Sequence, residues 1–269
     1  MVKFGINIWS YPYPAEVGVE DAMAHAAKAG YQGFEPALDT EDLESFSGEK
    51  WERIKAKANQ LNLEIPSIST GLFWQHNVIT EPEAALRVVK AECKAAKIMG
   101  AQVVLVVPGT AVPDLSYEEH FKRAAGWLCK AASIAREHGV KIGVENVWNR
   151  IFPGPLDFLK LPDMVGDESV GVYFDVGNTL PHSLPEHWIP LLGKRILQVH
   201  VKDYCITAGG LTRGFGIPLN GDVNWPAIRK ALVEIDYVDY LLPEVPPYPG
   251  DPYKAAEDAL SSLRKIFNR

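Results

Sequence analysis

Four side chains that can bind a metal ion stand at the ends of four short apolar segments in the second half of the sequence. They are Glu145, Asp175, His200 and Glu244. Three carboxylates that lie close together resist ionisation unless a cation lies among them. Three oxygen ligands and one imidazole, with no thiolate, suit a hard or borderline divalent ion. The residue types therefore predict one metal site, with Mn²⁺ as the first choice and Mg²⁺, Co²⁺ or Zn²⁺ as alternatives.

Such a site can transfer a proton at a carbon next to a carbonyl group. A divalent ion bound by the carbonyl and the adjacent hydroxyl of a ketose acidifies that carbon, because it stabilises the enediolate formed on deprotonation. Glu145 and Glu244 are the natural acid and base. Return of the proton to the opposite face of the carbon is epimerisation, and return to the neighbouring carbon is aldose–ketose isomerisation. The sequence leaves open which reaction occurs and which glutamate is the base.

The elements that must position these residues follow from the periodicity of the chain. Short β-rich segments alternate with longer amphipathic segments, which is typical of repeated βα units and a parallel sheet. The expected strands are 4–9, 33–37, 64–70, 102–108, 141–147, 170–176, 196–202 and 240–245. The expected helices lie around 18–29, 49–61, 82–99, 117–138, 155–164, 185–193, 224–234 and 253–267.

Eight βα units in about 250 residues predict a single-domain α/β protein, a (β/α)₈ TIM barrel over residues 1–269. A doubly wound open sheet is the alternative, but it usually has a glycine-rich turn after its first strand, and INIWSYPYP has none. The active site of a barrel lies at the carboxyl ends of its strands. A single strand-end carboxylate is often a capping residue, but four ligand types at four successive strand ends favour a metal site.

Composition limits the classes of partner. The net charge of −7 and the pI near 5.5 disfavour binding to nucleic acid. The three cysteines show no CxxC spacing, so we expect reduced thiols rather than disulfides or a thiolate zinc site. The N-terminus lacks the pattern of a signal peptide, and no apolar stretch approaches the length of a membrane span. These features predict a cytoplasmic protein that does not associate with membranes.

Further side chains are expected to contact a substrate at the mouth of the barrel. The candidates are Asn146, Asn178, Trp74, His76, Glu35, Trp148, Lys202 and Arg213. Arg213 lies in the glycine-rich segment 208-AGGLTRGFG-216, after the seventh expected strand. Backbone N–H groups and an arginine fork at this place can bind a phosphate. The alternative is a moving lid in which Arg213 is solvated.

The motifs resemble those of the xylose-isomerase-like TIM-barrel sugar (phosphate) isomerases and epimerases, over essentially the whole chain. The resemblance rests on VENVW, FDVGN, VHVKD, GDVNW and PEV. It implies that Glu145, Asp175, His200 and Glu244 bind one metal ion and that the two glutamates exchange the substrate proton. Free-ketose 3-epimerases of this family commonly carry a His where Asn178 stands. The DVGN form and the long segment after strand seven look more like the L-xylulose-5-phosphate or L-ribulose-5-phosphate 3-epimerases.

The sequence therefore predicts a metal-dependent isomerase of a sugar or sugar phosphate, with ketose(-phosphate) 3-epimerisation as the first choice. A lyase of the inosose dehydratase type would use the same site with a leaving hydroxyl group. An endonuclease IV-like phosphodiesterase would need more histidines and a basic surface. A non-catalytic sugar-sensing barrel would not need Glu145 and Glu244. The sugar, its phosphorylation and the oligomeric state, including a homo-oligomer, stay open.

Overall fold

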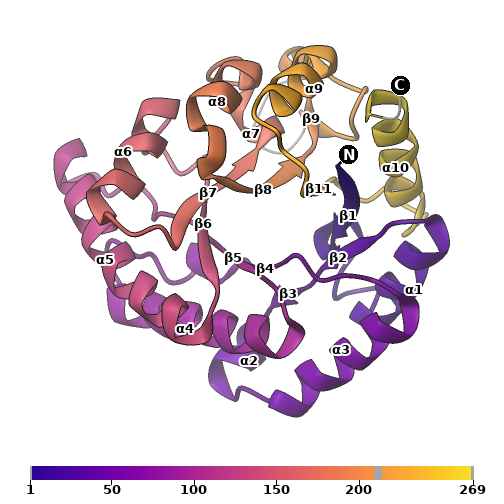
Figure 1. Cartoon of the computed structure of the whole chain (residues 1–269), viewed down its shortest axis with the longest axis horizontal. Coiled ribbons are helices and arrows are strands. Elements are labelled where there is room, and N and C mark those ends of the chain that lie inside the picture. The colour runs from indigo at the N-terminus through magenta and orange to yellow at the C-terminus, as the bar shows by residue number, and fades with distance from the viewer. Residues whose placement is uncertain (1, 209–213, 268–269) are drawn as a thin grey trace.

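Short parallel strands form a barrel with helices around it, as Figure 1 shows. The computed structural model describes residues 2–208 and 214–267. The barrel strands are β1 (Lys3–Asn7), β2 (Gly33–Glu35), β3 (Ala37–Leu38), β4 (Ser67–Thr70), β5 (Val103–Val106), β6 (Lys141–Glu145), β7 (Val170–Asp175), β8 (Ile196–Val201) and β11 (Tyr240–Pro243). Their order in the sheet is β2-β1-β11-β8-β7-β6-β5-β4-β3, and every neighbouring pair in this order is parallel.

The two ends of this order, β2 and β3, are halves of one barrel strand. Pro36 lies between them, and a proline has no N–H group to donate to a sheet. β2 pairs with β1, whereas β3 pairs with β4, and the N–H of Ser69 donates to the carbonyl of Pro36 at 3.1 Å. The sheet is thereby closed with eight strand positions, and the predicted (β/α)₈ barrel is confirmed.

Each predicted helix is present, with ends within about two residues of the expected ones. The major helices are α1 (Val19–Ala29), α3 (Gly48–Leu61), α4 (Pro82–Met99), α5 (Tyr117–His138), α6 (Pro155–Val165), α8 (Pro185–Leu192), α9 (Trp225–Glu234) and α10 (Lys254–Phe267). Their ends follow local signals. The Ser116 side chain accepts a hydrogen bond from the N–H of Glu119 at the start of α5, and Gly139 ends this helix in the left-handed conformation, with φ of 72°.

The sequence did not predict several short elements. They are α2 (Thr40–Glu44), α7 (Val176–Thr179), β9 (Asp203–Tyr204) and β10 (Phe215–Gly216), with 3₁₀ turns such as Ile8–Ser10. The first strand was expected to reach residue 9, but it ends at Asn7, because the Asn7 side chain accepts a hydrogen bond from the N–H of Trp9 and starts a turn. β9 and β10 pair antiparallel after β8, beside the mouth of the barrel.

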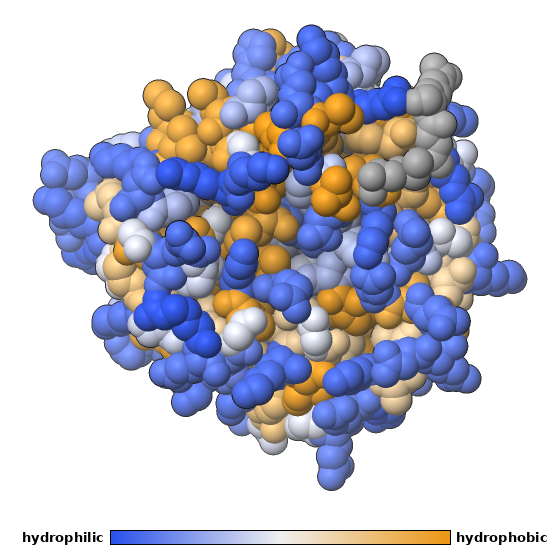
Figure 2. Space-filling view, in the orientation of Figure 1, coloured by the Kyte–Doolittle hydropathy of each residue, from blue (hydrophilic) through white to orange (hydrophobic). Residues whose placement is uncertain are grey.

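Polar residues predominate on one face of the molecule (Figure 2). Figure 2 shows hydrophilic residues around most of the periphery of the viewed face, with apolar residues interspersed nearer its centre. Among residues 2–208 and 214–267, no helix is both long enough and apolar enough to cross a bilayer.

Candidate active site

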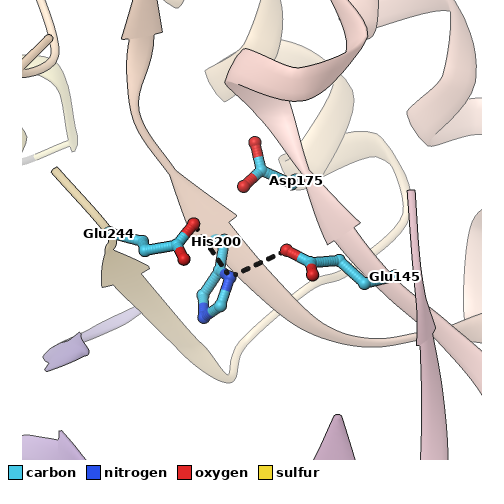
Figure 3. Close-up of side chains that lie close together, drawn as sticks. All are labelled: Glu145, Asp175, His200 and Glu244. Carbon is cyan, nitrogen blue, oxygen red and sulfur yellow. Dashed lines mark hydrogen bonds and ion pairs between the residues drawn. The ribbon is translucent and has the colours of Figure 1, made fainter. Parts of the chain in front are cut away.

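The structure brings the four predicted metal ligands together at the carboxyl ends of the barrel strands. One ligand atom from each of Glu145, Asp175, His200 and Glu244 lies within 4.8 Å of the others. Figure 3 shows their side chains converging on one point, with Glu145 and Glu244 on two sides of His200.

The register of the strands explains this convergence. Asp175 of β7 is aligned with His200 of β8, and Glu145 of β6 is aligned with Tyr173, two residues before Asp175. Side chains two residues apart on a strand point to the same side of the sheet. His200 is aligned with Leu242 of β11, two residues before Glu244. The alternation of side chains along each strand therefore directs all four ligands into the mouth of the barrel.

The cluster also contains cationic hydrogen-bond donors. His200 Nδ1 lies 3.2 Å from Glu145 Oε1 and 3.7 Å from Glu244 Oε2. The ammonium group of Lys202 forms an ion pair with Glu244 and lies 2.7 Å from Asp175 Oδ2. Asp175 Oδ2 is nevertheless buried without a properly oriented hydrogen bond from any described residue. Three carboxylates and an imidazole, with ligand atoms within 4.8 Å of one another, fit a bound divalent cation.

The electrostatics separate the two glutamates. Burial raises the pKa of Glu145 to about 7, with a further contribution from the charge of Glu244. Burial also acts to raise the pKa of Glu244, but the charges of Lys202 and His200 outweigh it, and the pKa lies below its ordinary value. Carboxyl groups whose pKa values are pushed apart are suited to separate acid and base roles.

The same effects apply to the other two ligands. Burial raises the pKa of Asp175, although the charge of Lys202 opposes the rise. Burial favours the neutral form of His200, but the charge of Glu35 and hydrogen bonds to Glu145 and Glu35 raise its pKa well above the ordinary value. The charges of the surrounding carboxylates therefore favour the protonated forms of His200 and Lys202.

Asn146 and Asn178 hold Asp175 in place. The side-chain oxygen of Asn146 accepts a hydrogen bond from the N–H of Asp175 at 2.7 Å, and its amide group donates to the Asp175 carbonyl at 2.9 Å. Asp175 Oδ1 accepts from the N–H of Asn178 at 2.8 Å and so caps α7. Asp175 is thus a capping residue as well as a candidate ligand. The structure gives both asparagines a role in positioning the ligand, beside their expected role in substrate binding.

A pocket of about 270 Å³ opens at this cluster. Its lining comprises Trp9, Thr70, Trp74, Leu105, Val107, Glu145, Val147, Trp148, Asn178, Lys202, Phe215 and Glu244. Four of the expected substrate contacts, Trp74, Trp148, Asn178 and Lys202, therefore face the pocket. Lys202 also forms a hydrogen bond with Glu244.

Other expected contacts lie elsewhere. His76 Nδ1 lies 3.3 Å from Glu81 Oε2, and His76 does not line this pocket. Glu35 has no exposed surface and is hydrogen-bonded to His200 inside the barrel, so its direct contact with a substrate stays a prediction. Its side chain faces inward because β2 aligns Glu35 with Asn7 of β1 deep in the barrel. Arg213 lies outside the described residues.

Sequence reasoning missed Phe215, which lines the pocket. Its ring centroid lies 5.0 Å from the Lys202 ammonium group and 5.0 Å from the ring centroid of Trp148. The sequence signal was an aromatic residue between two glycines, in a segment considered only for phosphate binding or as a lid. The β9–β10 pairing places this residue over Lys202.

Comparisons with known proteins agree with this fold. Residues 23–266 match the family model described as "Xylose isomerase-like TIM barrel". An inosose dehydratase from Clostridium perfringens is 26% identical over 99% of this chain and 98% of its own length. The structure of D-psicose 3-epimerase from Clostridium cellulolyticum H10 with D-tagatose superposes with a TM-score of 0.80 at 16% identity, over 98% of this chain and 99% of that one. The IolI protein with a bound zinc atom gives 0.82 at 19% identity, over 100% of both chains.

Proposed function

Because the chain belongs to the xylose isomerase-like TIM barrel family, we propose that it is a metal-dependent isomerase of a sugar or sugar phosphate, with ketose 3-epimerisation as its reaction. The observation that carries this proposal is the placement of Glu145 and Glu244 on two sides of one cluster of metal-ligand types, at a pocket of about 270 Å³. The likeness to a D-psicose 3-epimerase supports the same choice.

The residues of this chain divide the work in the following way. When bound, a divalent cation polarises a ketose carbonyl and acidifies the neighbouring C–H group. Glu145 and Glu244 lie on two sides of the cluster, so one can accept a proton and the other can donate one (Figure 3). Transfers on opposite faces of one carbon invert its configuration. Trp74 and Trp148 provide apolar walls that exclude water from the reacting carbon.

We propose Mn²⁺ as the physiological ion because three of the four candidate ligands are oxygen donors. Mn²⁺ present at 100 times its dissociation constant is expected to stabilise the fold by about 2.7 kcal/mol, because it binds the folded chain alone. Thermal unfolding after chelator treatment, with and without added Mn²⁺, Co²⁺, Mg²⁺ or Zn²⁺, measures this shift. Asp175→Asn should abolish most of it, and His76→Ala, which alters a histidine outside the cluster, should keep it. An unchanged unfolding temperature with all four ions would contradict the metal site.

A lyase of the inosose dehydratase type is the second candidate, and the curated relative at 26% identity favours it. Such a lyase starts with the same proton abstraction next to a carbonyl. It then needs a proton donor to a leaving hydroxyl group, a task that Glu145 or Lys202 could perform at this pocket. The two functions therefore share their first step and differ in the product.

Solvent proton exchange distinguishes the two functions. We expect the Mn²⁺-loaded protein in D₂O to place deuterium on a ketose at the epimerised carbon, as NMR can detect. Matched free and phosphorylated ketoses, together with inosose, form the test panel. Loss of water from inosose, seen as a new ultraviolet absorbance without an epimer, would favour the lyase. No exchange into any of these compounds would contradict both functions.

We propose that the substrate is phosphorylated, because the glycine-rich segment 208–216 contains Arg213 and has the composition of a phosphate-binding loop. A preference for the phosphorylated member of each matched pair supports that choice. Equal rates on the free and the phosphorylated ketose would favour the free sugar as the substrate.

A further inference from the structure

The two ring nitrogens of His200 face different partners. Nδ1 faces the cluster, 3.2 Å from Glu145 Oε1, and the dashed lines of Figure 3 join this side of the ring to Glu145 and Glu244. Nε2 points the other way and lies 2.8 Å from Glu35 Oε2. The side chains of His200 and Glu35 have no exposed surface. Glu35 stands on the second barrel strand and His200 on β8, so this contact crosses the interior of the barrel.

Three other donors converge on the Glu35 carboxylate. The amide of Asn7 donates to Oε2, and the hydroxyl groups of Ser67 and Tyr173 donate to Oε1 at 2.6 Å and 2.5 Å. A carboxylate that receives this many hydrogen bonds is held as an anion that only accepts. Any hydrogen between Glu35 and His200 Nε2 therefore belongs to the imidazole.

The surroundings also fix the plane of the imidazole ring. The Tyr173 ring lies 4.5 Å from the His200 ring, centroid to centroid, at an interplanar angle of 55°. The Tyr173 hydroxyl is at the same time a donor to Glu35. Glu35 and His200 are thus held by one shared neighbour, and neither can rotate without breaking a buried hydrogen bond.

We propose that Glu35 is a positioning residue, which holds the proton of His200 on Nε2 and thereby leaves the Nδ1 lone pair free to bind the cation. A neutral imidazole has one protonated nitrogen and one lone pair, and the partner of one nitrogen decides the state of the other. An accepting anion beside the non-ligating nitrogen also strengthens the ligating one, and loss of such a partner typically weakens metal binding 10–100-fold. This inference rests on the proposed metal site but not on the identity of the sugar.

The direct test is Glu35→Gln in the full-length chain, with Mn²⁺ binding measured by calorimetry in the absence of any sugar. We expect the dissociation constant to rise about 10–100-fold. A glutamine keeps the size of the side chain, but it carries no charge and replaces one accepting oxygen with a donor, so it holds the Nε2 proton less strongly. Glu35→Asp retains an anion and should recover part of the affinity. Ser67→Ala, which removes one donor but keeps the carboxylate, should change the affinity only a few-fold.

A second measurement takes its readout from the wild-type protein and uses a variant only to assign the signals. The ¹⁵N NMR shifts of His200 in the wild-type protein loaded with diamagnetic Zn²⁺ report which nitrogen carries hydrogen, and His200→Gln identifies the signals. We expect a protonated Nε2 and a metal-bound Nδ1. A metal-bound Nε2 would overturn the proposal, as would a well-folded Glu35→Gln protein with wild-type Mn²⁺ affinity. Both readouts are independent of turnover, so a failure of the proposed epimerase activity would leave them interpretable.

Discussion

Glu145→Gln and Glu244→Gln are each expected to lower kcat for ketose epimerisation by about 10²–10⁴-fold, the usual contribution of a positioned acid or base. The amide fills the same space but cannot exchange a proton at neutral pH. Because both residues are also candidate ligands, kcat is to be measured at saturating Mn²⁺ with the bound metal quantified. Glu137→Gln on the exposed surface of α5 is the matched control and should leave turnover unchanged.

Deuterium exchange in the same variants can assign the two roles. If each glutamate serves one face of the carbon, the remaining one can still remove and return a proton on its own face. We therefore expect each variant to exchange deuterium into one epimer and not into the other, while epimerisation is lost in both. Turnover within a few-fold of wild type in either variant would exclude that glutamate from proton transfer.

Glu92→Gln is expected to change the pH dependence of stability more than any other carboxylate substitution outside the metal cluster. Glu92 lies on α4 with no exposed surface, and neither carboxylate oxygen has a hydrogen-bond partner in the described part of the chain. Burial, with the nearby charge of Glu35, raises the pKa of Glu92 well above its ordinary value. The folded protein therefore keeps this group protonated and neutral at pH values where the unfolded chain ionises it.

The sign of the effect follows from proton linkage. Above the ordinary pKa of a glutamate, about 4.3, the folded state binds one more proton at Glu92 than the unfolded state does. The contribution of Glu92 to the free energy of unfolding is then lost with rising pH, by about 1.4 kcal/mol per pH unit, until the pH reaches the folded pKa. Glutamine does not titrate, so Glu92→Gln removes this loss.

Urea unfolding of the wild type and Glu92→Gln at pH 5, 6 and 7 measures the difference. The free energy of unfolding of the variant should rise relative to that of the wild type as the pH increases, by at most about 1.4 kcal/mol for each unit of pH, for as long as the pH is below the folded pKa of Glu92. Glu137→Gln, at an exposed carboxylate, should follow the wild type. Parallel curves for wild type and Glu92→Gln would show that Glu92 is ionised or paired in the folded protein.

The sequence by itself determined the barrel and the set of candidate ligands. The alternation of β-rich and amphipathic segments is a local pattern, and eight such units have one closed arrangement. Glu145, Asp175, His200 and Glu244 could be found because residues at the carboxyl ends of parallel strands must meet at one rim. Helix ends were predictable for the same local reason, as at Ser116 and Gly139, where the capping residue is read from the chain itself.

Only the tertiary structure decided what each side chain contacts across the barrel. Glu35 and His200 are 165 residues apart in sequence, and no local pattern shows that strand register turns Glu35 inward toward an imidazole and not upward toward the mouth. In the sequence, Glu92 resembles any polar residue of an amphipathic helix. Its burial results from the packing of α4 against the barrel, which excludes solvent from the side chain. The position of Lys202 between Asp175 and Glu244 was equally undetermined. These contacts depend on distances between segments that are far apart in the sequence. Closure of the barrel sets those distances, and neither composition nor residue spacing encodes them.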